Sequence, residues 1–216
     1  MVVTWRGTQE YGATLADQRA FRDGVIAGQR AEGLWLLEHP PVITTGRRGG
    51  VGDEARIRAA GYDLVATERG GLATCHEPGQ LVGYLFLDVS KIGVRRAVTA
   101  IEGGVIAWLR AMDLDANVRE GLPGVWVGRE KVCALGLHVK RGVTMHGFAL
   151  NLVNDLRGFD LIVPCGIVDG TVTSVQRLRG RSPSPEEAAP AVGAAVIAAL
   201  ASLRRAIALD TALVRE

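Results

Sequence analysis

The chain has 216 residues, 48% of them apolar and 22% charged, and its formal net charge is +2. These values are typical of a soluble globular protein with one sizeable core, and the charge is too small to indicate nucleic-acid binding. The three cysteines cannot all pair and have no metal-ligand spacing, which favours free thiols in a reducing compartment. The amino-terminal residues lack a signal-peptide pattern, and the longest apolar run, 191–203, is shorter than the ~20 residues that span a bilayer. We therefore expect a cytoplasmic protein that binds neither nucleic acid nor membranes.

Hydrophobic periodicity predicts the elements in chain order. We expect helices over 10–28, 94–112, 172–178 and 185–206, and strands over 34–38, 42–45, 64–67, 81–89 and 125–127. Ser184 is expected to cap the last helix, with acidic residues in its first turn. Strands interrupted by a few separate helices predict a mixed α/β (α+β) fold, and no linker divides residues 1–216 into two domains.

The segment 130–166 is the most informative part of the chain. Two apolar runs, 130–139 and 143–152, flank the short connection Lys140-Arg141-Gly142, which predicts a β-hairpin. The segment then reaches Pro164-Cys165-Gly166, where a turn presents the cysteine. A thiol reacts as the thiolate, and a nearby ammonium such as that of Lys131 favours this form. The alternative is that Cys165 is a small buried apolar residue and Lys131 a solvated charge at a strand end.

The segment 69–80 is a second candidate for binding. The pair Gly70-Gly71 allows close backbone approaches, so backbone amides here could line a pocket for a carbonyl or an extended chain. His76, which precedes Pro78-Gly79, could hydrogen-bond a substrate. The alternative is a tight turn with a structural histidine. The phosphate-binding pattern GxxxxGK[ST] is not found.

Basic residues are clustered along the chain, in a pattern that fits either a solvated surface or a docking face for an acidic protein partner. The clusters are Arg47-Arg48, Arg56 with Arg58, Arg95-Arg96, Lys140-Arg141, and Arg177 with Arg179 and Arg181.

Several motifs in order resemble the lipoyl(octanoyl) transferase family, LipB, over roughly residues 34 to 205. The matching motifs are Glu38-His39-Pro40-Pro41 with Thr45-Gly46-Arg47, Arg69-Gly70-Gly71 with Thr74-x-His76, Pro78-Gly79-Gln80-Leu81-Val82, Lys131 followed by Ala134-Leu135-Gly136, Thr144-x-His146-Gly147-x-Ala149-Leu150-Asn151, and Pro164-Cys165-Gly166. An ordered set at family-like spacing is far more specific than any single motif.

The resemblance implies a central mixed β-sheet flanked by helices, as in biotin and lipoate ligases, in one catalytic domain. It implies transfer of an octanoyl group from octanoyl-acyl carrier protein to a lysine on the lipoyl domains of 2-oxoacid dehydrogenases and on the glycine cleavage H protein, without a cofactor or metal. By the same analogy, Cys165 carries the acyl group and Lys131 tunes the thiol and relays protons. The implied substrate-binding residues are Arg69, Gly70, Gly71, Leu72, Ala73, Thr74, Cys75, His76, Ala134, Leu135, Gly136, Gly147, Phe148 and Ala149.

Two positions depart from the family pattern. Cys75 stands where the family usually has an aromatic residue, which predicts extra space beside the pocket and a second thiol. Glu77 stands where a glycine is usual, which predicts a carboxylate near the pocket and near Lys131.

Two other functions remain open on sequence grounds. An ATP-dependent lipoate or biotin ligase shares the expected fold, but its chemistry needs no nucleophilic cysteine. A non-catalytic relative that binds acyl carrier protein is the other alternative, which the changes at Cys75 and Glu77 would allow.

Overall fold

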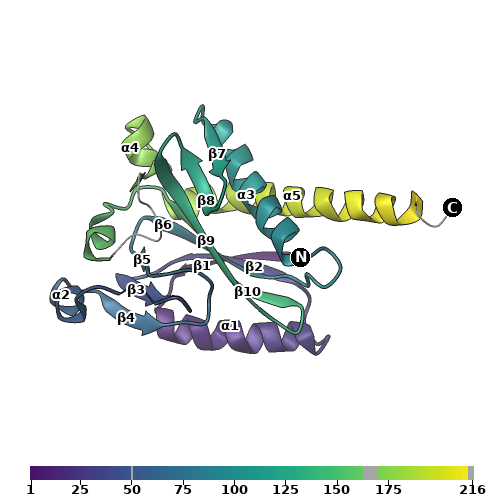
Figure 1. Ribbon diagram of the computed structural model, residues 1–216, viewed down its shortest axis with the longest axis horizontal. Helices are drawn as coiled ribbons and strands as arrows, with labels where there is room; N and C mark the ends of the chain where they lie inside the picture. Colours follow the sequence, from purple (N-terminus) through teal and green to yellow (C-terminus); the bar gives the residue numbers. More distant parts are fainter. Residues whose placement is uncertain (50, 163–169, 214–216) are drawn as a thin grey trace.

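A computed structural model describes residues 1–49, 51–162 and 170–213, with side chains described as far as residue 210 (Figure 1). Its centre is a mixed sheet in the order β1-β2-β6-β10-β9-β8-β7, with β11 paired to β9. The pairs β1–β2 and β9–β11 are parallel and the other pairs are antiparallel. The strands are β1 (Val2–Thr8), β2 (Gly33–Glu38), β6 (Gln80–Phe86), β7 (Ala116–Arg119), β8 (Leu122–Val127), β9 (Glu130–Lys140), β10 (Val143–Asn151) and β11 (Thr171–Val172).

A smaller sheet lies beside the central one, in the order β4-β3-β5. Its strands are β3 (Val42–Thr45), β4 (Asp63–Ala66) and β5 (Thr74–His76), and the short helix α2 (Glu54–Ala59) connects β3 to β4. The 3-10 helix η1 (Arg157–Leu161) packs against β5. A separate apolar cluster joins this sheet to η1, with Ile43, Ile57, Ala73, Cys75 and Ile162 at its centre.

Helices cover both faces of the central sheet (Figure 1). Helix α1 (Tyr11–Ile26) contributes Tyr11 and Leu15 to one apolar cluster, while α3 (Val94–Arg110) and α5 (Pro185–Leu213) contribute to the large cluster on the other face. Helices α3 and α5 approach closely at Gly104, where a Cβ atom would lie 2.5 Å from Cα of Val196. A glycine is therefore required where α3 and α5 cross. The short helix α4 (Val175–Arg179) follows β11.

Helix α5 begins with a capping box and is apolar over most of its length. The backbone N–H of Glu187 donates to Oγ of Ser184, and the Glu187 carboxylate accepts from the Ser184 N–H at 2.8 Å. Among the described residues, Pro185–Asp210 is long and apolar enough to cross a membrane by length and composition alone, as the core helix of a soluble protein can also be. Its buried core side chains are Ala188, Ala189, Val192, Val196 and Leu200.

The structure confirms the mixed α/β class, the central mixed sheet and most of the expected elements. The hairpin β9–β10 and the Ser184 cap are as predicted, whereas α5 continues to Leu213, beyond the predicted end at 206. The strands β1, β5, β7 and β11 and the helices α2 and η1 were not predicted, and the helix expected over 172–178 begins only at Val175, because Val172 belongs to β11. All of the missed elements except β1 have six or fewer residues, which is too short for a clear periodicity.

Candidate active site

A cavity of about 450 Å³ lies between the central sheet, the segment 69–76 and α1. Of the residues implied as functional, those that line it are Arg69, Gly70, Gly71, Ala73, Thr74, His76, Lys131, Ala134, Leu135, Gly136, Gly147, Phe148 and Ala149. Three distant parts of the sequence therefore meet around one enclosed space.

Two rows of cross-strand neighbours contribute small residues to the cavity floor. Ala149 of β10 pairs with Ala134 of β9 and with Val82 of β6. The next row on the same face is Gly147, flanked by Gly136 and by Tyr84. A Cβ atom at Gly147 would lie 2.0 Å from the carbonyl oxygen of Gly83, so this position admits no side chain. Small residues here keep the space above the sheet open.

Arg69 shapes the loop beside this floor. Its guanidinium donates to the carbonyl and hydroxyl oxygens of Thr44, and to the carbonyl oxygens of Gly70 and Leu72, at 2.7–3.2 Å. These five bonds match the five N–H donors of a guanidinium, so Arg69 holds the loop rather than offering donors to an anion. The Gly70 N–H then donates to the carbonyl oxygen of Leu137 at 3.0 Å, which fixes the loop on the edge of β9.

Cys75 and Leu72 are placed differently from the other implied residues, because neither lines the cavity. Side chains alternate along a strand, so Thr74 and His76 of β5 face the cavity while Cys75 points into the cluster with Ile43. The expectations that Cys75 contacts the substrate and opens space beside the pocket therefore do not agree with its position. Burial, followed by the nearby carboxylate of Glu77, raises the pKa of the Cys75 thiol.

The expectation that Glu77 lies at the pocket near Lys131 is also not met. Glu77 is buried, does not line the cavity, and accepts hydrogen bonds from the Tyr62 hydroxyl at 2.7 Å and the Leu156 N–H at 2.9 Å. The carboxylate therefore faces the segment that leads into η1.

A cluster of aromatic side chains borders the cavity beside α1, comprising Tyr11, His39, His76, Tyr84 and His146. All but His39 line the cavity. His39 contacts the carbonyl oxygen of Gln9 through Nδ1, so Nδ1 carries the hydrogen and Nε2 accepts from the Tyr84 hydroxyl at 2.7 Å. Burial lowers the pKa of His76 and of His146 to about 3, so both imidazoles are neutral near pH 7. They act there as hydrogen-bonding groups, not as cations.

Lys131 lies on β9 at the cavity, half-buried. Its ammonium is 4.8 Å from the centre of the Trp126 ring, a cation–π contact. Its strand neighbour is Val172 of β11, and its carbonyl oxygen accepts from the Thr173 N–H. Cys133, two residues along, is buried in the core, where burial raises the pKa of its thiol.

Cys165 lies outside the described residues. On either side of its segment, Ile162 and Val172 both line the cavity, and Val172 pairs with Lys131. Further lining residues that sequence analysis did not single out include Tyr11, Val82, Tyr84 and Leu137. The alternation in β6 could have indicated Val82 and Tyr84 together, whereas no local signal marks Tyr11.

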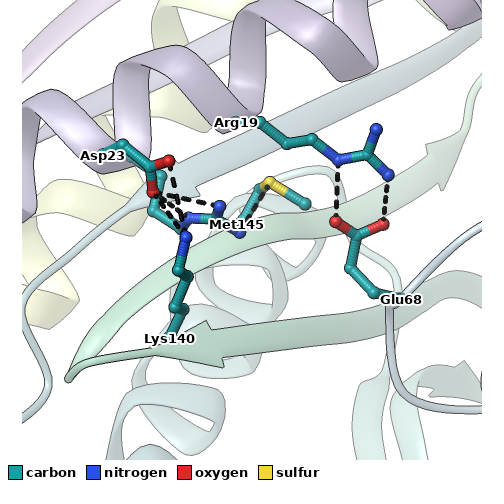
Figure 2. Close-up of polar contacts among 6 residues, drawn as sticks. Arg19, Asp23, Glu68, Lys140 and Met145 are labelled. Atoms are coloured by element: carbon teal, nitrogen blue, oxygen red, sulfur yellow. Dashed lines mark hydrogen bonds and ion pairs between the residues drawn. The ribbon is translucent and has the colours of Figure 1, made fainter.

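Helix α1 braces the two sides of the cavity (Figure 2). Arg19 forms two hydrogen bonds of 2.9 Å with the carboxylate of Glu68, the residue before Arg69. One turn further on, Asp23 accepts from Lys140 near the hairpin turn, at 3.3 Å. The same helix therefore fastens both the loop and the hairpin.

Comparison with known proteins gives the family. Residues 10–197 match the model of the lipoyl protein ligase A/B catalytic domain. The chain belongs to this family. An octanoyltransferase of Alkaliphilus metalliredigens is 43% identical over 181 residues, which cover 81% of this chain and 83% of the relative.

Solved structures show how widely the fold is shared. A lipoate-protein ligase A bound with ATP superposes with a TM-score of 0.69 and 16% identity, covering 95% of this chain and 86% of that one. A biotin protein ligase from Aquifex aeolicus superposes with a TM-score of 0.55 and 10% identity, covering 95% of this chain and 71% of that one. At these identities the likeness concerns the fold, and it confirms the expected kinship in fold with both ligase classes.

The positions of Cys75 and Cys133 predict that neither thiol reacts in the folded protein. Their raised pKa values keep both protonated, so iodoacetamide at pH 8 should label them only after unfolding in guanidinium. The same shifts predict that stability is unaffected below the unfolded thiol pKa of ~8.5 and falls as pH rises above it, because the unfolded thiols ionise first. Peptide mass spectrometry and denaturation at pH 7 and 9.5 test this. Rapid labelling of either cysteine in the native state would contradict it.

We predict that breaking the Arg19–Glu68 ion pair loosens the loop locally, at Gly70. Arg19→Gln should cost less than about 1 kcal/mol, because the Arg19 side chain is 49% exposed, yet should speed hydrogen exchange at the Gly70 amide. Asp17→Asn is the matched control, since Asp17 pairs with Arg6 and does not contact the loop. The hydrogen bonds from Arg19 hold the pKa of Glu68 at about 2. The contribution of the pair to folding stability is therefore complete above the unfolded-state pKa of ~4.3 and is lost as pH falls towards 2. Equal exchange at Gly70 in both variants would refute the brace.

Proposed function

We propose that this protein moves an octanoyl group from acyl carrier protein, through a thioester on Cys165, to the lysine of a lipoyl domain. The octanoyltransferase activity itself, in lipoate biosynthesis, follows from the family and from relatives about 40% identical over most of the chain. The observation that carries the proposed site is the cavity of about 450 Å³ that Lys131 lines, together with Ile162 and Val172 on either side of the cysteine segment.

The proposed first half-reaction transfers the acyl group to the enzyme. The Cys165 thiolate attacks the thioester carbonyl of the octanoyl carrier, and backbone amides stabilise the oxyanion that forms. The carbon–sulfur bond to the carrier then breaks, and Lys131 supplies a proton to the departing thiolate. The products are the octanoyl-enzyme thioester and the free thiol of the carrier, and Lys131 is left as the neutral amine.

The second half-reaction returns the enzyme to its starting state. The amine of the lipoyl-domain lysine attacks the enzyme thioester, an amide bond forms, and the bond to the Cys165 sulfur breaks. Lys131, now a neutral amine, accepts the proton that the attacking nitrogen loses. Cys165 leaves as the thiolate, so no cofactor, nucleotide or metal enters the balance.

The cavity fits the acyl part of this substrate. Its floor is the small-residue surface of Ala134, Ala149 and Val82, and Leu135 and Phe148 also line it. Burying an alkyl chain against such a surface contributes about 0.8 kcal/mol for each CH₂ group. The hydrogen bonds printed for the Arg69 guanidinium go to oxygen atoms of the loop and of Thr44, and His76 and His146 are neutral, so the apolar part of the lining faces the alkyl chain.

Exposed arginines adjoin the cavity and suit acidic partners. Arg48 lines it and, like Arg47, is exposed on the loop after β3. We propose that these charges steer acyl carrier protein and the lipoyl domains of 2-oxoacid dehydrogenases and the glycine cleavage H protein, which are generally acidic. We also propose that residues 1–216 form one catalytic domain and that the protein acts in the cytoplasm.

The proposed covalent step predicts a stable adduct on one cysteine. Octanoyl-acyl carrier protein, mixed with the enzyme without a lipoyl domain, should add one octanoyl group to Cys165 in intact-mass and peptide spectra. Cys165→Ser should abolish both adduct and turnover while keeping the fold, since the side-chain volume barely changes. Cys75→Ala and Cys133→Ala should keep the adduct, because both thiols lie away from the cavity lining.

Three results would overturn this step. Loss of the adduct in either alanine variant would mean that the wrong thiol is named. Transfer that requires ATP and proceeds in Cys165→Ser would instead indicate a ligase, and no transfer of either kind would indicate a non-catalytic carrier-binding protein.

The proposed role of Lys131 predicts a split between thiol reactivity and turnover. Lys131→Met removes the cation at nearly constant length, so alkylation of Cys165 should shift to higher pH. Lys131→Arg keeps a charge but cannot give up a proton near pH 7, so the thiol should stay reactive while kcat falls by about 10²–10⁴-fold. Alkylation rates from pH 5 to 10 and steady-state kinetics measure the two effects. An unchanged alkylation profile in Lys131→Met would exclude Lys131 as the activating cation.

A further inference from the structure

A buried polar network lies behind the cavity wall and consists of Glu77, Gln80, Asn151 and Asn154. Each side chain is at most 4% exposed. Asn154 Nδ2 donates to Glu77 Oε1 at 3.0 Å and to Asn151 Oδ1 at 3.1 Å, and Gln80 Nε2 donates to the same Asn151 oxygen at 2.8 Å. Four polar groups from the β5–β6 turn, β6, β10 and the segment after β10 are therefore joined without direct access to solvent.

The carboxylate of Glu77 determines which groups of this network donate hydrogen bonds and which accept them. An ionised carboxylate only accepts hydrogen bonds, so Asn154 must present its amide nitrogen to Glu77. That nitrogen and the Gln80 nitrogen then fix the Asn151 oxygen as an acceptor, which leaves the Asn151 nitrogen to donate outward. Among the described residues the Asn154 Oδ1 atom is buried without a hydrogen-bond partner, whereas its Nδ2 atom donates to both Glu77 and Asn151.

The network anchors two described stretches, at Leu156 and at Thr173. Glu77 accepts from the Leu156 N–H at 2.9 Å, and Leu156 has a φ of 71°, a left-handed conformation that leucine rarely adopts. In the other stretch, Asn151 donates to the carbonyl oxygen of Thr173 at 2.9 Å, and the Thr173 N–H bonds to the carbonyl oxygen of Lys131. Phe159 and Ile162, which line the cavity, follow the first of these anchors.

The same carboxylate also meets the side chains beneath η1. Its Oε2 atom accepts from the Tyr62 hydroxyl at 2.7 Å, and the Cys75 thiol lies at 3.8 Å from it. Gly158 fits against both neighbours, because a Cβ atom there would lie 2.2 Å from Sγ of Cys75 and 2.7 Å from the Tyr62 ring. Cys75 and Glu77 are thus parts of one packed unit, and that unit ends at the cavity wall.

We propose that Glu77 is a positioning residue, which fixes the segment 156–162 and with it the wall of the acyl cavity formed by Phe159 and Ile162. This inference rests on the proposed function, because it assigns the wall to binding of the acyl chain. Glu77 itself touches no substrate, and it acts through the Leu156 amide, the Tyr62 hydroxyl and Asn154.

The test compares two substitutions that keep the length of the side chain. Glu77→Met removes all acceptors, so the Leu156 amide should exchange faster and the KM for octanoyl-acyl carrier protein should rise about tenfold, more than kcat falls. Glu77→Gln retains one oxygen for Leu156 and Asn154, and its nitrogen can donate to Tyr62. It should restore both values to within about twofold of the wild type. Tyr62→Phe, which removes one hydrogen bond and keeps the ring, should lie between them.

Glu32→Met is the matched control. Glu32 accepts from the Asp88 N–H and from Arg204, and none of the three residues lines the cavity. Its loss should lower the melting temperature without changing the KM. If Glu77→Met changes only the melting temperature, as the control does, Glu77 is a structural residue and the proposal is wrong.

A direct binding measurement separates this proposal from the proposed function. Octanoyl-pantetheine, titrated into a Cys165→Ser background, should bind about tenfold more weakly when Glu77→Met is added, and normally when Glu77→Gln is added. If this weakening is found while the native enzyme, with Cys165 intact, forms no acyl-enzyme from octanoyl-acyl carrier protein, the positioning role is supported and the transfer mechanism is refuted. Equal binding by all of these variants, or no binding by any, would overturn the positioning role even if the wild type transfers octanoyl groups.

Discussion

The cavity depends on a close approach of backbones that excludes side chains. At Gly147 any Cβ atom would collide with the carbonyl oxygen of Gly83, and at Gly136 it would lie 3.1 Å from the carbonyl oxygen of Gly70. Gly136 lets the loop 69–71 rest on the edge of β9, and Gly147 allows the close pairing of β10 with β6. The cavity exists because floor residues such as Ala134, Ala149 and Gly136 have small side chains or none, and larger residues there would fill it.

Charged side chains maintain this arrangement from outside the space. The guanidinium of Arg69 bonds to oxygen atoms of the loop and of Thr44, and the Glu68 carboxylate beside it is tied to Arg19 of α1. Arg69 and Glu68 are thus bonded to the protein frame, while Lys131 also lies at the cavity, with its ammonium over the Trp126 ring. This division fits a site in which a proton moves while the walls stay fixed.

Local pattern was enough to predict the hairpin and the long helices, because period and turn chemistry act over a few residues. The residues of β9 and β10 that line the cavity were implied only by the family resemblance. The orientation of Cys75 was not predicted, since the segment 69–80 was expected to be a loop, and strand alternation was not applied to its three residues in β5. Glu77 was expected at the pocket for the same reason. Its partners Tyr62 and Leu156 are distant in sequence, and only the folded chain brings them together.

The position of α5 in the chain has a consequence for synthesis. This helix covers the sheet face formed by Leu34, Leu36, Leu81 and Leu85, which all precede it in the chain by about 100 residues or more. While the ribosome is still making the middle of the chain, that apolar face has no α5 to cover it. The nascent protein is therefore most exposed to aggregation just before its last helix emerges, and slow elongation late in the gene would lengthen that interval.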